Sequence, residues 1–194
     1  MPLKVIGGRF GGRALEAPPG KGTRPSSGRT RLAVMNMLGR SGVEGASVLD
    51  LYAGTGASGI EALSRGAARC VFVERDRAAL ASLRRNIESL GLREAEAHVL
   101  AADAAGALAA GPLDGEPFGL VFCDPPYEVF RGAAAERALR LALGALAARG
   151  GVAAGGALVL EHPANGGFHT PVPGLSEVAQ RRYSAAGVSI LRPP

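Results

Sequence analysis

The sequence predicts an α/β protein with a mostly parallel central sheet that is covered by helices on both faces. From residue 46 onward, short apolar runs alternate with helical segments, as in a succession of strand–helix units. The runs lack the polar alternation of a half-exposed strand, which is typical of strands buried on both faces. Near the end of the chain, two strand-like segments are joined by a short turn, which predicts an antiparallel hairpin at one edge of the sheet.

The first 40 residues form an extension that precedes this pattern. Residues 4–15 hold two short strand-like stretches around glycine-rich turns, which predicts a small β-hairpin. A loop rich in Pro, Gly and Ser follows at residues 18–28, and a helix is expected near residues 30–38. We therefore divide the chain into an extension at residues 1–40 and a main domain at residues 41–194.

The elements of the main domain follow from its apolar runs. Strands are expected at residues 47–52, 69–74, 97–102, 118–123 and 157–161. Helices are expected near residues 58–65, 77–90, 104–109 and 133–149, the last two being rich in alanine, the best helix former. The closing hairpin is expected at residues 178–183 and 187–191.

The positive charge of the chain is concentrated in the extension. Residues 1–40 contain eight basic side chains and one acidic side chain, whereas the other 154 residues contain 14 basic and 16 acidic ones. A basic arm on a nearly neutral domain is typical of proteins that bind nucleic-acid phosphates. We expect Lys4, Arg9 and Arg13 to make such contacts. Arg24 is grouped with them, although contact with a cofactor carboxylate or capping of the next helix stays open for it.

The composition favours one cytoplasmic domain, which we expect to be a monomer. A hydrophobic content of 47% in 194 residues supplies one core, no run of 18 apolar residues exists, and the start of the chain lacks the apolar segment of a signal peptide. Cys70 and Cys123 lie in apolar runs, as buried free thiols do. His98, His162 and His169 show no metal-ligand spacing, so no metal is expected.

A glycine-rich loop follows the first strand. Residues 54–59 match the spacing G-x-G-x-x-G, which lets a ligand approach the backbone at the positive start of a helix. Glu74, 20 residues after Gly54, ends the next strand, where it could hold ribose hydroxyls. A dinucleotide site would satisfy this much of the sequence. Asp50 argues against it, because a carboxylate four residues before Gly54 suits an ammonium group and repels a pyrophosphate.

The four residues Asp124-Pro125-Pro126-Tyr127 follow the apolar run at residues 118–123. A carboxylate and a fixed backbone carbonyl side by side can accept both hydrogens of a planar NH2 group, and Tyr127 can stack on the ring that carries it. This pattern predicts a site for chemistry on a nucleobase amine. The alternative is a strand that ends in an ordinary turn, because Pro-Pro cannot continue a ladder and Asp commonly opens turns.

The two motifs together resemble those of the S-adenosylmethionine-dependent amino-methyltransferases, in which D-x-x-x-G-x-G precedes D-P-P-Y. More narrowly, the chain resembles the bacterial 16S ribosomal RNA guanine-N2 methyltransferases of the small subunit. This resemblance covers nearly the whole chain and is carried further by residues 5–13, 24–27, 59–67 and 73–74. Two places depart from the family pattern: Gly28 stands where an acidic residue is usual, and Arg31-Leu32 stands where an Arg-Glu pair is usual.

The resemblance implies a Rossmann-like methyltransferase fold and a site for S-adenosyl-L-methionine. Asp50 would lie near the methionine ammonium, with the backbone of Ala53, Gly54 and Gly56 against the methionine part. Glu74 would bind the ribose. For the adenine, Asp103 would meet the amine and the backbone of Ala104 the ring, although Asp103 could also simply cap the helix that follows it.

The resemblance also implies the reaction and the partner. Asp124 and the Pro125 carbonyl would hold the N2 amine of a guanine, and Tyr127 would stack on the base after it leaves its helix. The partner would be 16S ribosomal RNA, either naked or within an assembled small-subunit particle. Three other functions stay open: an adenine-N6 or cytosine-N4 methyltransferase, an NAD-dependent oxidoreductase, and a non-catalytic RNA-binding assembly factor.

Overall fold

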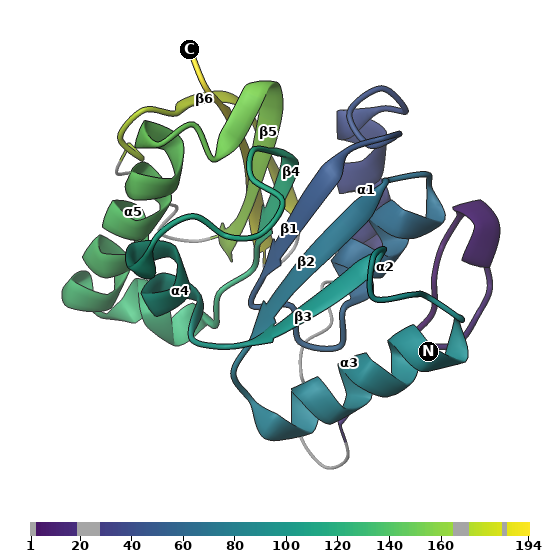
Figure 1. Cartoon of the computed structure of the whole chain (residues 1–194). Coiled ribbons are helices and arrows are strands. Elements are labelled where there is room, and N and C mark those ends of the chain that lie inside the picture. The colour runs from purple at the N-terminus through teal and green to yellow at the C-terminus, as the bar shows by residue number, and fades with distance from the viewer. Residues whose placement is uncertain (1–2, 19–27, 165–170, 184–185) are drawn as a thin grey trace.

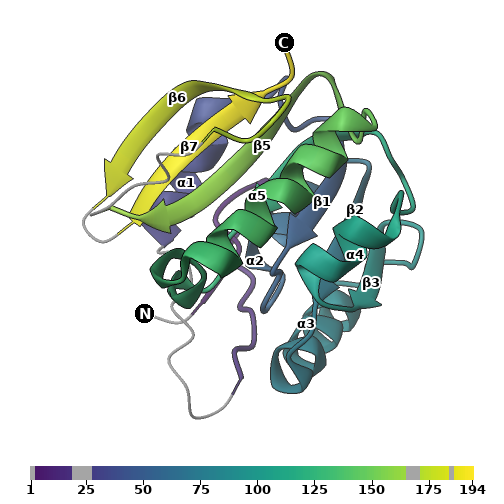
Figure 2. The ribbon, with the colours of Figure 1, turned by 90° about the vertical axis from the view of Figure 1, so that its left-hand side faces the viewer.

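One mixed sheet of seven strands forms the centre of the part of the chain that the structure describes, in the order β3-β2-β1-β4-β5-β7-β6 (Figures 1 and 2). The structure is a computed structural model and describes residues 3–18, 28–164, 171–183 and 186–194. Its strands are β1 (Ser47–Leu51), β2 (Arg69–Glu74), β3 (Ala97–Ala101), β4 (Phe118–Cys123), β5 (Val152–Pro163), β6 (Ser176–Tyr183) and β7 (Ala186–Arg192). β1 to β5 pair in parallel, whereas β7 is antiparallel to both β5 and β6.

Helices cover both faces of the sheet, as Figures 1 and 2 show from two sides. α1 (Gly28–Leu38), α2 (Ala57–Ser64) and α3 (Arg77–Ser89) lie on one face, and α4 (Ala104–Ala110) and α5 (Ala133–Ala148) lie on the other. Two 3-10 helices, η1 (Gly8–Phe10) and η2 (Tyr127–Arg131), complete the described elements. The predicted fold, a Rossmann-like sheet with an antiparallel hairpin at its edge, is confirmed.

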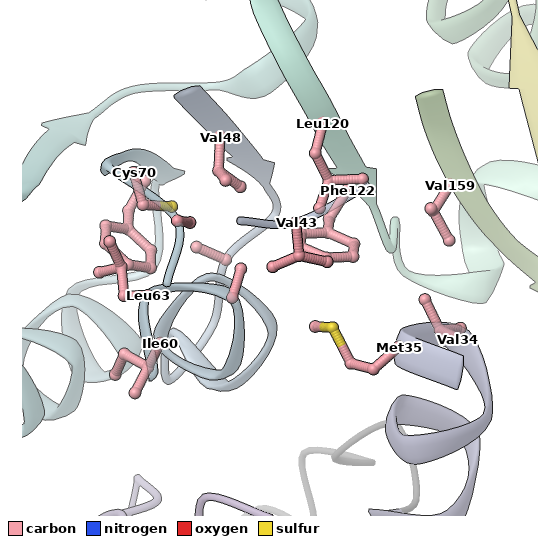
Figure 3. Packing of buried hydrophobic residues seen from close by; sticks show 14 of the residues in the cluster. Val34, Met35, Val43, Val48, Ile60, Leu63, Cys70, Leu120, Phe122 and Val159 are labelled. Atoms are coloured by element: carbon pink, nitrogen blue, oxygen red, sulfur yellow. The ribbon is translucent and has the colours of Figure 1, made fainter. Parts of the chain in front are cut away.

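The sheet separates two cores, because side chains alternate across each strand. Val48 and Phe122 belong to the core under α1, α2 and α3, whereas Leu49 and Val121 belong to the core under α4 and α5. Figure 3 shows the first core from close by, with Met35 of α1 facing the strand residues. Fully buried apolar side chains on both faces explain why these strands read as unbroken apolar runs.

The end of the parallel region differs from the prediction in one strand. β2 and β4 have the predicted bounds, but β5 begins five residues earlier than the expected strand at residues 157–161. The pairing of β4 with β5 shifts register between Phe118 and Leu120, and Gly155 has a φ of +75°. A bulge therefore accommodates the glycines that resemble a turn in the sequence.

The predicted N-terminal hairpin is present in a short form. Lys4 and Ala14 form an antiparallel bridge, flanked by backbone hydrogen bonds from the N–H of Val5 to the carbonyl of Arg13 and from the N–H of Leu15 to the carbonyl of Leu3, and η1 lies in the loop between them. The loop is bound to α2, since the Glu61 carboxylate accepts hydrogen bonds from the backbone N–H groups of Ile6 and Gly7 at 2.7 and 3.0 Å. Val5 and Leu15 are buried in the core below α1. The extension thus shares a core with the main domain.

The strand order fixes where a ligand can bind. After β1, the chain adds β2 and β3 on one side of it and then crosses to add β4 and β5 on its other side. The direction in which strands are added therefore reverses between β1 and β4. In open α/β sheets, ligands bind at this reversal, outside the carboxyl ends of the strands. The glycine loop follows β1 and Asp124 follows β4, so both motifs meet at this point.

Two general findings concern the described residues only. None of their helices is both long and apolar enough to span a bilayer. No group of three or more His, Cys, Asp or Glu side chains among them could hold a metal ion.

Candidate active site

The glycine loop between β1 and α2 is held in a left-handed backbone conformation. Gly54 and Gly56 have φ values of +56° and +80°, which side chains other than glycine rarely adopt. At Gly56 a Cβ atom would lie 2.4 Å from Leu83 Cδ1, so the loop packs tightly against α3 there. At Gly54 the nearest atom would be the Tyr52 carbonyl oxygen at 4.0 Å. The loop thus offers bare backbone and open space at Gly54.

Asp50 and Ala53 hold the ends of the loop through hydrogen bonds. The Asp50 carboxylate, which is almost fully buried, accepts a hydrogen bond of 2.9 Å from the backbone N–H of Gly59 in α2. The N–H of Ala53 donates to the carbonyl of Val73, and the N–H of Gly56 donates to the carbonyl of Ala53. Burial raises the pKa of Asp50 to about 8, and the nearby Asp124 charge adds to that shift. A ligand cation near Asp50 would favour its charged form.

Glu74 ends β2 next to the loop. One carboxylate oxygen accepts a 2.7 Å hydrogen bond from the N–H of Gly54, and the other accepts hydrogen bonds of 2.8 Å from the N–H groups of Arg75 and Asp76. Glu74 therefore fixes the loop conformation. The structure brings it to the loop, where the sequence predicts a ribose contact.

Asp103 and Ala104 follow β3, one strand further from the reversal point. Asp103 caps α4, since its carboxylate accepts from the N–H of Gly106 at 3.0 Å, and it also forms an ion pair with Arg75. The capping alternative is thus confirmed for Asp103. Because its side chain is about half exposed, an adenine amine could still reach it. Ala104 is buried at the start of the helix.

The Asp124-Pro125-Pro126-Tyr127 segment leaves β4 at the level of the glycine loop. The backbone N–H of Asp124 lies 3.5 Å from the carbonyl of Leu51 in β1, which ties the two strand ends together. Pro125 is buried, and η2 begins at Tyr127, which is half-buried. The Asp124 carboxyl group, the Pro125 carbonyl and the Tyr127 ring therefore follow one another directly after the end of β4.

Asp124 lines a small pocket beneath α1 together with a second acid. The pocket residues come from α1, α2, β4 and β5 and are Thr30, Arg31, Val34, Ser58, Phe122, Cys123, Asp124, Val159 and Glu161. Burial raises the pKa of both Asp124 and Glu161 above the usual carboxyl range, and the Asp124 charge adds to the shift of Glu161. Neither carboxyl group forms a hydrogen bond with the described residues.

Arg31 is the basic residue of this pocket. It is buried, its Nη2 donates to the carbonyl of Lys4 at 2.7 Å, and its Nε lies 3.8 Å from the Glu61 carboxylate. Its Nε and Nη1 atoms have no hydrogen-bond partner among the described residues. Buried donors without a partner are uncommon in folded proteins, so these atoms are candidates for a ligand contact.

The sequence interpretation missed both Glu161 and Arg31. Glu161 carries the same signal as Asp124, an acid directly after an apolar run, and that rule would have found it. Arg31 has no such signal, because its place depends on how α1 lies across the sheet. The structure is needed to find it.

The predicted RNA-contacting residues lie away from this pocket. The Arg9 guanidinium forms a 2.7 Å ion pair with Glu96, just before β3, and lowers the pKa of Glu96 to about 2. Arg13 donates to the carbonyl of Ser89 at the end of α3. These contacts lie at the amino edge of the parallel strands, opposite the glycine loop. Lys4 is exposed, and Arg24 lies outside the described residues.

The charges of the site suit a cationic ligand. Asp50 is a buried carboxyl group, Asp124 and Glu161 are half-buried ones, and Arg31 is the basic group that lines the pocket with them. S-Adenosylmethionine carries a sulfonium and an ammonium group against one carboxylate, so it fits this excess of acids and the bare backbone at Gly54. The pyrophosphate of a dinucleotide would instead oppose the ionisation of these carboxyl groups.

Comparison with known proteins supports this interpretation. A family described as "Conserved hypothetical protein 95" matches residues 3–192. "Putative rRNA methyltransferase YlbH" of Bacillus subtilis (strain 168) is 34% identical over 190 residues, which are 98% of each chain. "Ribosomal RNA small subunit methyltransferase D" of Escherichia coli (strain K12) is 39% identical over 125 residues, which are 64% of this chain and 60% of that one.

Two solved structures agree along nearly the whole chain. "Putative methyltransferase yhhF from Escherichia coli" has a TM-score of 0.80 at 30% identity and covers 98% of this chain and 97% of its own. A Thermus thermophilus protein described as hypothetical has a TM-score of 0.77 at 31% identity and covers 98% of this chain and 99% of its own. The fold is thus the Rossmann-like fold of the methyltransferases, and the chain belongs to the family described as Conserved hypothetical protein 95.

Proposed function

We propose that this protein transfers a methyl group from S-adenosylmethionine to the N2 amine of a guanine in 16S ribosomal RNA. The observation that carries the proposal is the Asp124 carboxyl group, which has no hydrogen bond to the described residues and lies at the strand end beside the glycine loop. The names of the relatives support a ribosomal RNA methyltransferase. The choice of guanine N2 and of 16S RNA rests on the resemblance of the sequence.

S-Adenosylmethionine is the methyl donor that the family and the site support. When bound, it supplies an electrophilic methyl group on a sulfonium. Gly54 and Gly56 would contact its methionine part through the backbone, and Asp50 would lie near its ammonium. Glu74 is bonded to the N–H of Gly54, so a ribose contact would add to its role in holding the loop.

The chemistry asks for alignment more than for a strong base. A guanine amine is weakly nucleophilic because its lone pair is shared with the ring. Acceptors at Asp124 and the Pro125 carbonyl favour the geometry in which that pair points at the methyl carbon, and alignment supplies much of the rate. The amine becomes acidic only as the methyl group arrives, so Asp124 or water can take the proton afterwards. Tyr127 would stack on the flipped base.

The alternatives are weaker on particular observations. An NAD-dependent oxidoreductase would place a pyrophosphate among these carboxyl groups and would leave Asp124 unused. An assembly factor without catalysis would not need the hydrogen-bond acceptors of Asp124 and Pro125 at the end of β4. An adenine-N6 or cytosine-N4 methyltransferase could use the same four residues, so this alternative needs a direct test.

The substrate is proposed to be RNA within a folded small-subunit particle. The described structure has no separate recognition domain, and RNA is often read by its shape. Lys4, Arg9, Arg13 and Arg24 remain the proposed phosphate contacts, although Arg9 and Arg13 are held at the opposite edge of the sheet. The protein is proposed to act as a monomer.

An Asp124→Ala variant tests the role of the acceptor. We expect methyl transfer to RNA to fall by at least ~100-fold, because the amine loses its acceptor, while S-adenosylmethionine binding stays near the wild-type value. The measurement pairs labelled methyl transfer with calorimetric binding of the cofactor. Glu128→Gln, at an exposed acid of η2, is the matched control. Wild-type transfer rates in Asp124→Ala would refute the assignment.

A further inference from the structure

Glu161 lies beside Asp124 in the sheet. β4 and β5 are parallel, and Cys123 pairs with Leu160, so Asp124 and Glu161 are each one residue beyond that pair. Neighbouring strands are about 4.8 Å apart, which puts the two residues side by side. Phe122 and Val159, two positions earlier on each strand, share the core under α1. Both carboxyl groups line the pocket beneath α1 accordingly.

The proposed reaction uses Asp124 but leaves Glu161 without a role. Glu161 is half-buried, carries a raised pKa from burial and from the Asp124 charge, and has no hydrogen bond to the described residues. Burying a carboxyl group without a partner costs stability. The Nε and Nη1 donors of Arg31, which lines the same pocket, are unpaired among the described residues. The pocket therefore holds two carboxyl groups without a hydrogen bond and the Arg31 guanidinium, which forms an ion pair with Glu61 but keeps an unsatisfied Nη1 donor; one ligand could satisfy all three.

Among the bases with an exocyclic amine, guanine alone matches this set. The ring nitrogen beside the amine is an acceptor in adenine (N1) and in cytosine (N3), and a carboxylate would repel it. In guanine the amine is flanked by N1–H, a donor, and the same edge continues to O6, an acceptor. Two acceptors and a donor on the protein complement two donors and an acceptor on that edge.

We propose that Glu161 is the residue that selects guanine, by accepting a hydrogen bond from N1–H while Asp124 holds the N2 amine. Arg31 supplies the donor for O6. This inference rests on the proposed function, since it assumes that a base enters the pocket beside Asp124. The N1–H donor stabilises the carboxylate form of Glu161 in the complex. A protonated Glu161 would instead donate to an acceptor at ring position 1, and would favour bases that have one.

The test uses a substrate in which this hydrogen bond is reversed. The target guanine is first mapped with the wild-type enzyme and is then replaced by 2-aminopurine in the smallest 16S RNA substrate that is methylated. 2-Aminopurine keeps the N2 amine but has an acceptor at N1 and lacks O6. We expect kcat/KM of the wild type to fall by at least ~10-fold on this substrate, because a charge-assisted hydrogen bond is lost.

A Glu161→Gln variant separates selection from structure. Its amide can accept from the N1–H of guanine or donate to N1 of 2-aminopurine, so the preference for guanine should shrink by at least ~10-fold. Arg31 and the intrinsic reactivity of each amine are common to both enzymes and cancel in this ratio. Glu128→Gln, at an exposed acid of η2, should keep the wild-type ratio.

The outcomes are distinct. Equal losses of Glu161→Gln on both substrates would assign Glu161 a structural role and overturn the inference. Wild-type enzyme that methylates 2-aminopurine as well as guanine would overturn it without any variant. A wild-type enzyme that forms no N2-methylguanosine in the mapping step would instead refute the proposed function itself.

Discussion

Replacing Glu61 by Gln should strongly destabilise the protein. The Glu61 side chain is fully buried in α2 and accepts hydrogen bonds from the backbone of Ile6 and Gly7 and from Arg65. It is also the nearest opposite charge to the buried guanidinium of Arg31, at 3.8 Å. Burial lowers the pKa of Arg31, and the charges of Glu61 and Asp50 oppose that effect. The variant keeps the shape of the side chain but removes this charge.

The size of the loss follows from the buried partners. Breaking a buried ion pair on one side costs about 3–5 kcal/mol, because the other charge stays buried without compensation. A glutamine also replaces one carboxylate oxygen by an NH2 group. This NH2 group would face at least one of the donors that now bond to Glu61, the N–H groups of Ile6 and Gly7 and the Arg65 guanidinium. For a chain of this length, each kcal/mol lowers Tm by about 2–4 °C, so we expect a decrease on the order of 10 °C.

Urea unfolding and trypsin cleavage would measure this effect. The free energy of unfolding should decrease, and the bonds after Arg9 and Arg13 should be cut faster, because the loop loses its anchor on α2. Glu44→Gln is the matched control, since its ion pair with Arg40 is exposed, and it should leave stability unchanged. A Glu61→Gln variant as stable as Glu44→Gln would refute the reasoning.

Three further predictions concern the site and the basic arm. Asp50 has a pKa of about 8 in the folded protein against 3.8 in an unfolded chain, so the folded state holds a proton that the unfolded state has lost between these values. The free energy of unfolding of the ligand-free protein should therefore decrease as pH rises from about 5 to 8. Asp50→Asn should make this decrease smaller in thermal unfolding. Gly59→Ala should lower the free energy of unfolding by about 1–3 kcal/mol, because the new Cβ would lie 2.4 Å from Phe72. Gly54→Ala strains the backbone at its positive φ and should in addition weaken S-adenosylmethionine binding in calorimetry. The double variant Arg9→Ala, Arg13→Ala should weaken RNA binding in a filter assay and reduce its salt dependence.

Each of these has its own contradicting result. For Asp50, wild-type stability that rises between pH 5 and 8 would mean that the carboxyl groups of the site do not take up protons on folding. For the glycines, normal S-adenosylmethionine binding by Gly54→Ala would contradict the predicted contact between the loop backbone and the cofactor. For the arm, the control is Arg181→Ala, Arg182→Ala on the far edge strand β6, and equal RNA binding by both double variants would remove the arm from the interface.

The sequence predicts the parallel sheet well because its signal is local. An apolar run of six residues such as Phe118–Cys123 reflects burial on both faces, and the strand has the predicted bounds. The prediction fails where local residues have a distant partner. The glycines before Ala157 resemble a turn, yet a bulge against β4 keeps them in the strand. The N-terminal hairpin is confirmed in a short form, but its anchor, Glu61, is 54 residues away from Gly7 and could not be predicted locally.

The same distinction holds at the site. Asp124 and the glycine loop carry motifs, and the order of the strands brings them to one edge. Glu161 carries only the signal of an acid after an apolar run, and Arg31 carries none, because the role of both depends on sharing a pocket with Asp124. Roles for such residues depend on packing, which no single stretch of sequence contains.

The most direct test of the central claim is the identity of the methylated nucleoside. Purified protein would be incubated with labelled S-adenosylmethionine and small-subunit particles, or their 16S RNA, from cells that lack the gene, and the RNA would then be digested to nucleosides. The arrangement of Asp124, Pro125 and Tyr127 beside the glycine loop predicts that the label appears in N2-methylguanosine. Label in N6-methyladenosine or N4-methylcytidine, or no transfer to RNA at all, would contradict the account.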